Sequence, residues 1–473
     1  MSRSSKVSQG RSSDPRRNNV LSVTTFVLYC VYTIDYYVRI SARVPVLAAA
    51  RPTLLMFGLI VVLLLFQLPH LRGRLASPAA KALLALLAYI ALSLPFVTWP
   101  GSVLQNLEPY TRAVAFFFFS ALIVDTDERL FVFLGVFVGC QIFRVLEPLY
   151  LHLTTGYLGD STYLGDGNFA GRLSGGPYDV VNPNGLGFVT VGCVPFLYYV
   201  LYRAKQLYLK GIAIALVGAC LYALVLTMSR GAMIALLVVV WAIFRETKQK
   251  VLFLAAVVAV CVLVWAHLGS VDRDRYLSLV GGHGAQGTVQ AEEDETAYGR
   301  VQVTEEEFEI GMERPIFGHG LGTTQEAKVH SGHGPQASHN LYTELLVEIG
   351  VVGAFFFLRF LYSIYCELRE AVAWLAQDKG RPTDDIHRRL IQALVALFWM
   401  YLVFSSNYWG LSQDYWYALA GLVTVCARQI HSVKVLQPKT VAKGQFPPPR
   451  RIKPSRAPGG RGKLLTATQR SRK

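Results

Sequence analysis

A succession of long apolar runs constrains the fold of this chain more than any other feature. After an apolar segment that begins at Val20, each run holds roughly 15–25 mainly apolar residues, the length that an α-helix needs to cross about 30 Å of hydrocarbon. Charged residues make up 16% of the chain, whereas soluble domains carry about a quarter. The sequence therefore predicts an all-α integral membrane protein with about twelve transmembrane helices. The later runs cover residues 52–68, 81–97, 112–124, 129–152, 184–202, 211–228, 230–245, 250–268, 340–365, 388–406 and 412–430.

The placement of lysine and arginine predicts the orientation of these helices. With the N-terminus inside, the internal loops are rich in basic residues and the external loops hold far fewer, so the positive-inside rule places both ends in the cytoplasm. We interpret the first apolar segment as an uncleaved helix, because the small residues at 48–50 lie too far downstream for signal cleavage. Residues 1–19 and 431–473 are polar and basic, and we expect both to be disordered, with the tail on the anionic inner leaflet.

The net charge of +15 would also suit a nucleic-acid-binding protein. The basic residues gather in the tails and in short loops between apolar runs, and no soluble module alternates aromatic with basic residues. We therefore expect membrane lipid, and no nucleic acid, as a partner.

Two of the external loops are long. One covers residues 153–183, and the other covers residues 269–338 and is large enough to form an extramembrane subdomain. Within the second loop, the acidic, periodic segment 292–309 predicts a helix and the segment 315–322 predicts turns. The expected organisation is helices 1–9 within residues 20–268, the loop subdomain at 269–338, and helices 10–12 within residues 339–430.

The stretch 338–353 closes the second loop and opens an apolar helix. Ser338 and Asn340 are cap residues, so we expect His339 at the mouth of a helix whose positive dipole end favours an anion. Glu344 and Glu348 are four residues apart on one helix face, and such a pair is expected to face protein or water. His339 has two open interpretations, a catalyst or a structural residue beside the cap.

Arginine is scarce on the predicted external side, so two arginines near helix boundaries are informative. Arg172 lies upstream of Asn182-Pro183-Asn184, which predicts a helix start with Asn184 as a cap. Arg230 follows Ser229 at a break between two apolar runs that leaves almost no loop. An arginine at that depth is a functional candidate, and the alternative is a side chain that snorkels to lipid headgroups.

A third arginine, Arg300, lies in the acidic segment of the large loop. Ion pairing with Glu305, Glu306 or Glu307 is the simpler role for it, and a part in catalysis is the alternative.

The histidines and cysteines of the chain favour neither a metal site nor a disulfide framework. His330, His333 and His339 are flanked by Gly, Ser and Pro without a suitably spaced acidic ligand, so we expect no metal and no other cofactor. The cysteines lie almost all inside apolar runs and form no CxxC pair, which is typical of small buried hydrophobic residues.

Arginines that converge with a histidine suit one kind of chemistry. Guanidinium groups bind phosphates through two parallel hydrogen bonds, and a histidine accepts a proton from an attacking hydroxyl. Together they suit the displacement of a diphosphate leaving group, with the arginines neutralising charge in place of a divalent ion.

At these residues the chain resembles the bacterial O-antigen ligase and O-antigen polymerase superfamily, over about residues 165–360. The resemblance lies in four pieces in the same order: Arg172 before Asn182-Pro183-Asn184; Ser229-Arg230-Gly231; Gly299-Arg300 before Pro315-x-x-Gly318-x-Gly320; and His339-Asn340 with Glu348-Ile349-Gly350-x-x-Gly353.

The resemblance implies a GT-C-like fold and a metal-independent glycosyltransferase on the periplasmic face of the bacterial inner membrane. Its donor would be a glycan on undecaprenyl pyrophosphate, and its acceptor lipid A–core, a growing glycan or a protein. The glycine-rich, acidic stretch 281–295 and the basic tail depart from the family pattern and leave the acceptor open.

The resemblance also assigns roles to individual residues. Arg172 and Arg230 would hold the donor pyrophosphate, with Arg300 as a further contact. His339 would activate the acceptor hydroxyl or steady the leaving group. The expected supporting residues are Asn184, Ser229, Asn340, Glu344 and Glu348.

The alternative function is a polytopic transporter or flippase for a lipid-linked saccharide. Transporters usually show repeats and broken helices that carry charge near the middle of the membrane. The predicted clustering of charge at the outer interface favours the transferase.

Overall fold

The computed structural model describes residues 15–165, 168–267, 273, 301–335, 337–377, 382–408 and 410–435. The described residues up to 431 form one compact unit, which contains every site discussed below. A long helix lies over every predicted apolar run. These helices are α1 (Pro15–Val38), α4 (Pro52–Leu71), α5 (Pro78–Ser93), α6 (Pro100–Ile123), α7 (Asp127–Thr155), α8 (Pro183–Pro195), α9 (Leu207–Leu226), α10 (Arg230–Glu246), α11 (Lys250–His267), α15 (Leu341–Gln377), α16 (Pro382–Phe404) and α17 (Tyr415–Val435).

The multi-pass membrane architecture is confirmed, whereas the number of crossings stays a prediction. Within the described part of the chain, eight segments are long and apolar enough to span a bilayer. They correspond to α1, α4, α5, α7, α8 with its π-helical continuation η3 (Phe196–Tyr202), α9, α15 and α16. Helix α10 has 17 residues, which is at the short limit for crossing hydrocarbon.

The first helix begins earlier than expected. We predicted disorder up to residue 19, but α1 starts at Pro15. Proline is favoured at the first position of a helix because its fixed φ suits the turn and its missing N–H has no partner there. The prediction of disorder was therefore wrong for residues 15–19, and also for residues 431–435, which continue α17. Residues 1–14 and 436–473 lie outside the described residues.

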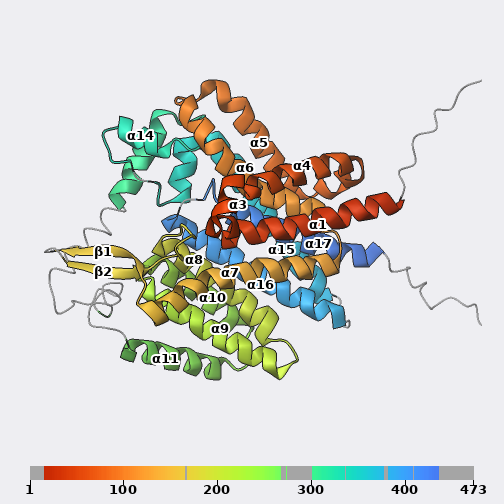
Figure 1. Ribbon diagram of the computed structural model, residues 1–473, viewed down its shortest axis with the longest axis vertical. Coiled ribbons are helices and arrows are strands. Elements are labelled where there is room, and N and C mark those ends of the chain that lie inside the picture. Colours follow the sequence, from red (N-terminus) through yellow and green to blue (C-terminus); the bar gives the residue numbers. More distant parts are fainter. Residues whose placement is uncertain are drawn as a thin grey trace, which may run out of the picture. The chain divides into compact units, whose positions relative to one another are not determined.

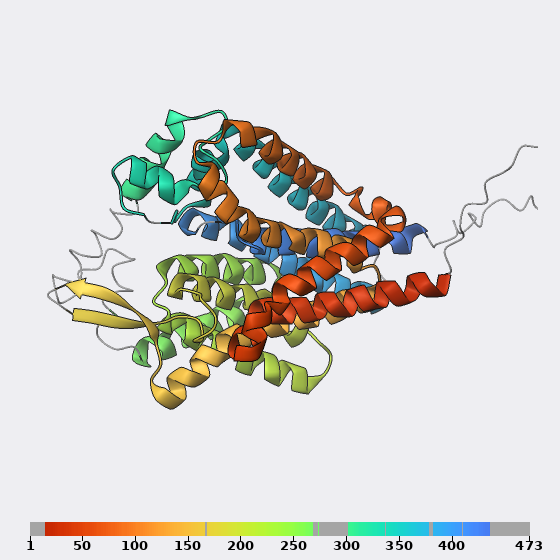
Figure 2. The same cartoon turned by 45° about the horizontal axis from the view of Figure 1, so that its top comes forward.

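The first long loop contains a β-hairpin that we did not predict. Strands β1 (Gly159–Gly165) and β2 (Asn168–Leu173) are antiparallel, with Asp160 opposite Arg172. Asp166-Gly167 lies between them in the sequence, and this dipeptide is a strong hairpin signal. The hairpin projects from one end of the helix bundle, where the short helix α14 (Thr324–His330) also lies, while α1 begins at the other end (Figures 1 and 2).

The large loop docks on a break in α15. Gly350 has a left-handed φ of 64°, and its neighbours bond to the loop backbone: His319 N donates to Val347 O at 2.8 Å, Gly320 N to Glu348 O at 2.9 Å, and Val351 N to Pro315 O at 2.7 Å. A Cβ on Gly350 would lie 2.4 Å from Ile316 O. The motif at 315–320 and the motif at 348–353 are therefore bonded to each other through their backbones. We call this contact the backbone joint, and its role is structural.

The acidic segment of the loop is helical over residues 301–313. This agrees with the predicted helix at 292–309 for the part that is described and extends it. The predicted glycine-rich stretch 281–295 lies outside the described residues, as does Arg300.

Helix α8 lies at the centre of the elements that position the site. It packs against α7, α9, α10 and α16. A Cβ on Gly187 of α8 would lie 2.7 Å from the Cβ of Ala232 on α10 and 3.2 Å from that of Ser229. This close approach brings the start of α10 against the first turns of α8.

Candidate active site

Arg172 ties the hairpin to two helix ends. Its Nε donates to the carbonyl oxygen of Thr227 at 2.9 Å, and its Nη2 donates to Asn184 Oδ1 at 3.1 Å. We expected Arg172 in an irregular loop, and the structure places it on β2 instead. Its guanidinium group therefore joins β2, the start of α8 and the α9–α10 connection.

The role predicted for Asn184 as a cap was wrong. The N-cap of α8 is Asn182, whose side chain accepts from Gly185 N at 2.8 Å, with Pro183 in the first helical position. Asn182 caps the helix because the cap residue has extended backbone and precedes the first helical residue. The Asn184 side chain is thereby available to accept from Arg172.

The break between α9 and α10 agrees with the prediction. Met228 has a left-handed φ of 49°, and the buried Ser229 caps α10 by accepting from Ala232 N at 3.4 Å. Arg230 is the first residue of α10 and is half-buried. Arg172 bonds to the carbonyl oxygen of Thr227, three residues before Arg230. Both arginines therefore lie at the boundary between α9 and α10. We call Arg172, Asn184, Thr227, Ser229 and Arg230 the arginine cluster.

His339 lies at the mouth of α15, as predicted. It is half-buried, and Asn340 Oδ1 accepts from Tyr342 N at 2.9 Å, so Asn340 caps the helix that begins at Leu341. The buried Ser338 donates to Asn340 O at 2.9 Å and to Glu307 Oε2 at 2.8 Å. We call residues 338–343 the histidine segment.

Three residues that follow α16 connect the arginine cluster with the histidine segment. A Cβ on Gly231 would lie 3.3 Å from the Asn407 Cβ, one on Gly185 would lie 2.8 Å from the Tyr408 hydroxyl, and one on Gly410 would lie 3.2 Å from Leu341 Cδ1. Asn407, Tyr408 and Gly410, here called the junction residues, thus contact the starts of α10, α8 and α15 respectively. One short segment therefore lies against the starts of α8, α10 and α15, which are the helix starts that bear Asn184, Arg230 and the residues after His339.

The starts of α10 and α15 lie in a region that is similar to a known family. Residues 214–358 match the O-antigen ligase family model. The match covers Arg230 and His339 and agrees with the resemblance inferred from the sequence. No curated protein matches the chain. Arg172, Asn184 and the junction residues lie outside the O-antigen ligase match, and Arg172, Asn407 and Gly410 contact it at Thr227, Gly231 and Leu341 respectively.

The carboxylates of Glu344 and Glu348 accept hydrogen bonds from two loops that lie against α15. Glu344 Oε2 accepts from the backbone N–H groups of Gly410 and Leu411 at 2.8 and 3.2 Å. Glu348 accepts from Gly322 N and from Thr324 Oγ1, both at 2.8 Å. Both side chains are buried, and buried acceptors of this kind are costly to leave without donors. Glu344 therefore holds the segment at Gly410 and Leu411 against α15, and Glu348 holds the large loop at Gly322 and Thr324 against α15.

A cavity of about 870 Å³ lies beside the arginine cluster, and its volume is within the usual range of ligand sites. Its wall includes residues 174–177, which follow Arg172 along the chain, and Tyr408 of the junction residues. The cations of its lining are Arg39, Arg112 and Arg144, and the anions are Glu108, Asp160, Asp179 and Asp414. All of the lining lies outside the O-antigen ligase match.

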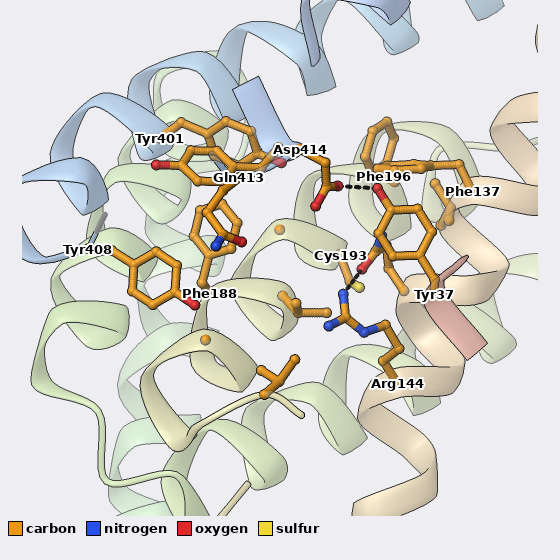
Figure 3. Close-up of a pocket in the computed structure, with 17 residues that line it drawn as sticks. Tyr37, Phe137, Arg144, Phe188, Cys193, Phe196, Tyr401, Tyr408, Gln413 and Asp414 are labelled. Carbon is orange, nitrogen blue, oxygen red and sulfur yellow. Dashed lines mark hydrogen bonds between the residues drawn. The ribbon is translucent and has the colours of Figure 1, made fainter. Parts of the chain in front are cut away.

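A smaller pocket of about 90 Å³ shares part of that lining (Figure 3). Tyr37, Arg144 and Asp414 lie on one side of it, and the rings of Phe188, Tyr401 and Tyr408 lie on the other. Two hydrogen bonds join Arg144 to Asp179, at 2.6 Å from Nε and 3.0 Å from Nη2. The Tyr37 hydroxyl donates to Asp414, and burial raises the pKa of the Asp414 carboxyl above its ordinary value.

The sequence analysis missed the arginines of this cavity. Arg144 lies inside the predicted span 129–152, and an arginine within an apolar helix is itself a functional signal. Arg39 and Arg112 flank apolar runs and could have been recognised in the same way. The aromatic lining could not, because aromatic residues are frequent throughout the chain.

The remaining predicted residues of the large loop have other neighbours. His330 packs edge-on against Trp99 with ring centroids 5.0 Å apart, and His333 lies 3.6 Å from Glu306. Of the proposed partners of Arg300, Glu306 accepts from Gln302 at 2.9 Å and Glu307 forms an ion pair with Lys328. The proposed role of Arg300 itself stays a prediction.

Proposed function

We propose that this protein is an inner-membrane transferase that moves a glycan from undecaprenyl pyrophosphate to an acceptor on the periplasmic face. The observation that carries the proposal is the contact of the junction residues with the starts of α8, α10 and α15. These contacts connect the segments that carry the arginine cluster and the histidine segment, and the O-antigen ligase match includes residues of both, which supports a shared site.

The proposed reaction is a single displacement. A hydroxyl oxygen of the acceptor attacks the anomeric carbon of the donor sugar, and the bond from that carbon to the diphosphate oxygen breaks. Undecaprenyl pyrophosphate leaves with the electron pair, and the hydroxyl proton passes to the His339 imidazole. A positioned base of this kind accelerates a reaction by roughly 10²–10⁴-fold.

The arginines would divide the work of holding the donor. Arg230 is half-buried at the N-terminus of α10, where a guanidinium group and the helix dipole both favour a phosphate oxygen. Arg172 already donates to Thr227 O and Asn184 Oδ1, so it also fixes the position of the α9–α10 connection. Arg300 would add a donor contact from the large loop.

The glycan would occupy the large cavity. Its lining combines tyrosine rings with carboxylate and guanidinium groups, and aromatic faces with a few well-placed polar groups are typical of ligand sites. A glycan that entered there would lie beside the segment that continues from Arg172.

The basic residues support the proposed orientation. α1 begins at the end of the bundle opposite to the hairpin (Figure 2), after a segment rich in arginine. If that segment stays in the cytoplasm, the hairpin, the large loop and His339 face the periplasm. The proposed loop subdomain of residues 269–338 would then lie outside the membrane.

The decisive experiment supplies the purified protein with a lipid-linked glycan and each class of acceptor. A new glycosidic bond is expected, and it must disappear in the His339→Ala variant. A ladder of lengthening products would identify a polymerase, and one capped product would identify a ligase. If labelled lipid-linked saccharide instead crosses vesicles unchanged, with equal rates for the wild type and His339→Ala, the transporter alternative is correct and the proposal fails.

A further inference from the structure

The histidine segment is held by a buried ion pair from the large loop. Lys328 Nζ on α14 lies 2.6 Å from Glu307 Oε1 on the helix at residues 301–313. The side chains of Lys328 and Glu307 are only 2% and 1% exposed. The pair is thus removed from solvent, and it lies well away in sequence from His339.

The second carboxylate oxygen of Glu307 contacts both sides of His339. Glu307 Oε2 accepts from Ser338 Oγ at 2.8 Å and also from Thr343 Oγ1. Ser338 directly precedes His339, and Thr343 lies in the first turn of α15. One carboxylate therefore fixes the backbone before the imidazole and the helix after it.

Stability alone does not account for an ionised pair at this position. Well-packed apolar residues of similar volume often stabilise a fold as much as a buried ion pair does, whereas loss of one partner leaves a costly unpaired charge. A carboxylate can make contacts that an apolar side chain cannot: one oxygen of Glu307 forms the ion pair with Lys328, and the other accepts from two hydroxyl groups.

We propose that Glu307 is a positioning residue for His339 and that Lys328 holds it in place. This inference rests on the proposed function, because it assigns Glu307 to the reaction of His339. It also gives the large loop a part in the reaction, since both members of the pair belong to that loop. Glycan transfer then requires the loop to be folded even where the loop does not touch the substrate.

The test compares Glu307→Gln with Glu367→Gln. Glu367 is a matched control, because it is a buried carboxylate on α15 that accepts from Ala79 N at 2.9 Å and from Thr424 Oγ1 at 2.8 Å. Displacement of a catalytic group by about 1 Å costs roughly 10²-fold in rate. Glu307→Gln should therefore lower kcat by about that factor, with the KM for the lipid donor unchanged, whereas Glu367→Gln should keep the kcat of the folded fraction.

A second variant protects the test against misfolding. Thr343→Val keeps the shape of the side chain and the ion pair but removes one hydroxyl, so kcat should fall by roughly 3–10-fold. Combined with Glu307→Gln, it should add little, because both changes remove the same interaction. Additive losses, or a Glu307→Gln enzyme with the kcat of the control, would overturn the inference. If His339→Ala retains full transfer, the proposed function fails, and the two failures are thereby distinguished.

Discussion

The arginine cluster and the histidine segment meet at the junction residues but are held in place by different interactions. The arginine cluster is held by hydrogen bonds from Arg172 to a backbone carbonyl and to an amide, and by glycines that let α8 approach α10 closely. The histidine segment is held by the buried carboxylate of Glu307, which accepts from Ser338 and Thr343. The first arrangement leaves Arg230 at the start of α10, where we propose that it binds a ligand. The second fixes the backbone around His339, whose proposed reaction needs one orientation of the ring.

The largest expected effects are on kcat for the histidine segment and on the KM for the lipid donor for the arginine cluster. His339→Ala removes the proposed base and should lower kcat by roughly 10²–10⁴-fold, with little change in donor affinity. Arg230→Ala removes a proposed phosphate contact and should raise the KM for the lipid donor, with Arg230→Lys in between because lysine lacks the planar fork. Steady-state transfer assays with varied donor concentration measure both. If both variants lowered kcat equally and left KM unchanged, His339 and Arg230 would not have the separate roles that we propose.

A smaller effect tests whether Arg172 acts partly through its neighbours. Asn184→Ala leaves the guanidinium group in place but removes an acceptor at 3.1 Å, and loss of such a hydrogen bond costs about 0.5–1.5 kcal/mol. We expect a loss in transfer of up to about tenfold, well below that of Arg172→Ala. The same assay decides this: if Asn184→Ala matches Arg172→Ala, positioning accounts for the whole role of the arginine.

Packing in the arginine cluster can be tested without touching any polar group. Gly187→Ala places a Cβ 2.7 Å from that of Ala232, and overpacking of this kind costs about 1–3 kcal/mol. Gly218→Ala on α9 is the control, because nothing lies within 4 Å of its added Cβ. Thermal unfolding in detergent should show a lower midpoint for the first variant and an equal or higher one for the second. A stable Gly187→Ala protein would show that α8 has room to move.

The smallest expected effect concerns Asp414, which lines both the large cavity and the smaller pocket. Burial raises the pKa of Asp414, so as pH rises through the ordinary carboxyl range the unfolded chain releases a proton that the folded chain keeps, and the folded state loses stability. Asp414→Asn lacks this ionisation but can still accept from Tyr37. The midpoint of the wild type should therefore fall relative to that of Asp414→Asn as the pH rises above about 4, the ordinary pKa of an aspartate. A constant difference would mean that Asp414 titrates alike in both states.

The helices were predictable, and the connections between them were only partly so. Apolar length decides a membrane helix locally, so each run matched a helix, and Ser229, Asn340 and Pro183 marked helix starts correctly. The hairpin was missed although Asp166-Gly167 signals it, because the loop was read only for its polar residues. The pairing of Lys328 with Glu307 could not be predicted, because it joins two helices of a loop whose fold depends on its docking to α15.

The backbone joint at Gly350 limits how this protein can be re-engineered. Because the carbonyl oxygens of Val347 and Glu348 bond to the loop, grafting a foreign loop onto α15 would strand those acceptors unless the graft brought matching donors. Chimaeras that are designed to exchange acceptor preference should thus transplant residues 315–351 as one piece. A chimaera whose boundary lies inside this interval should fail to fold.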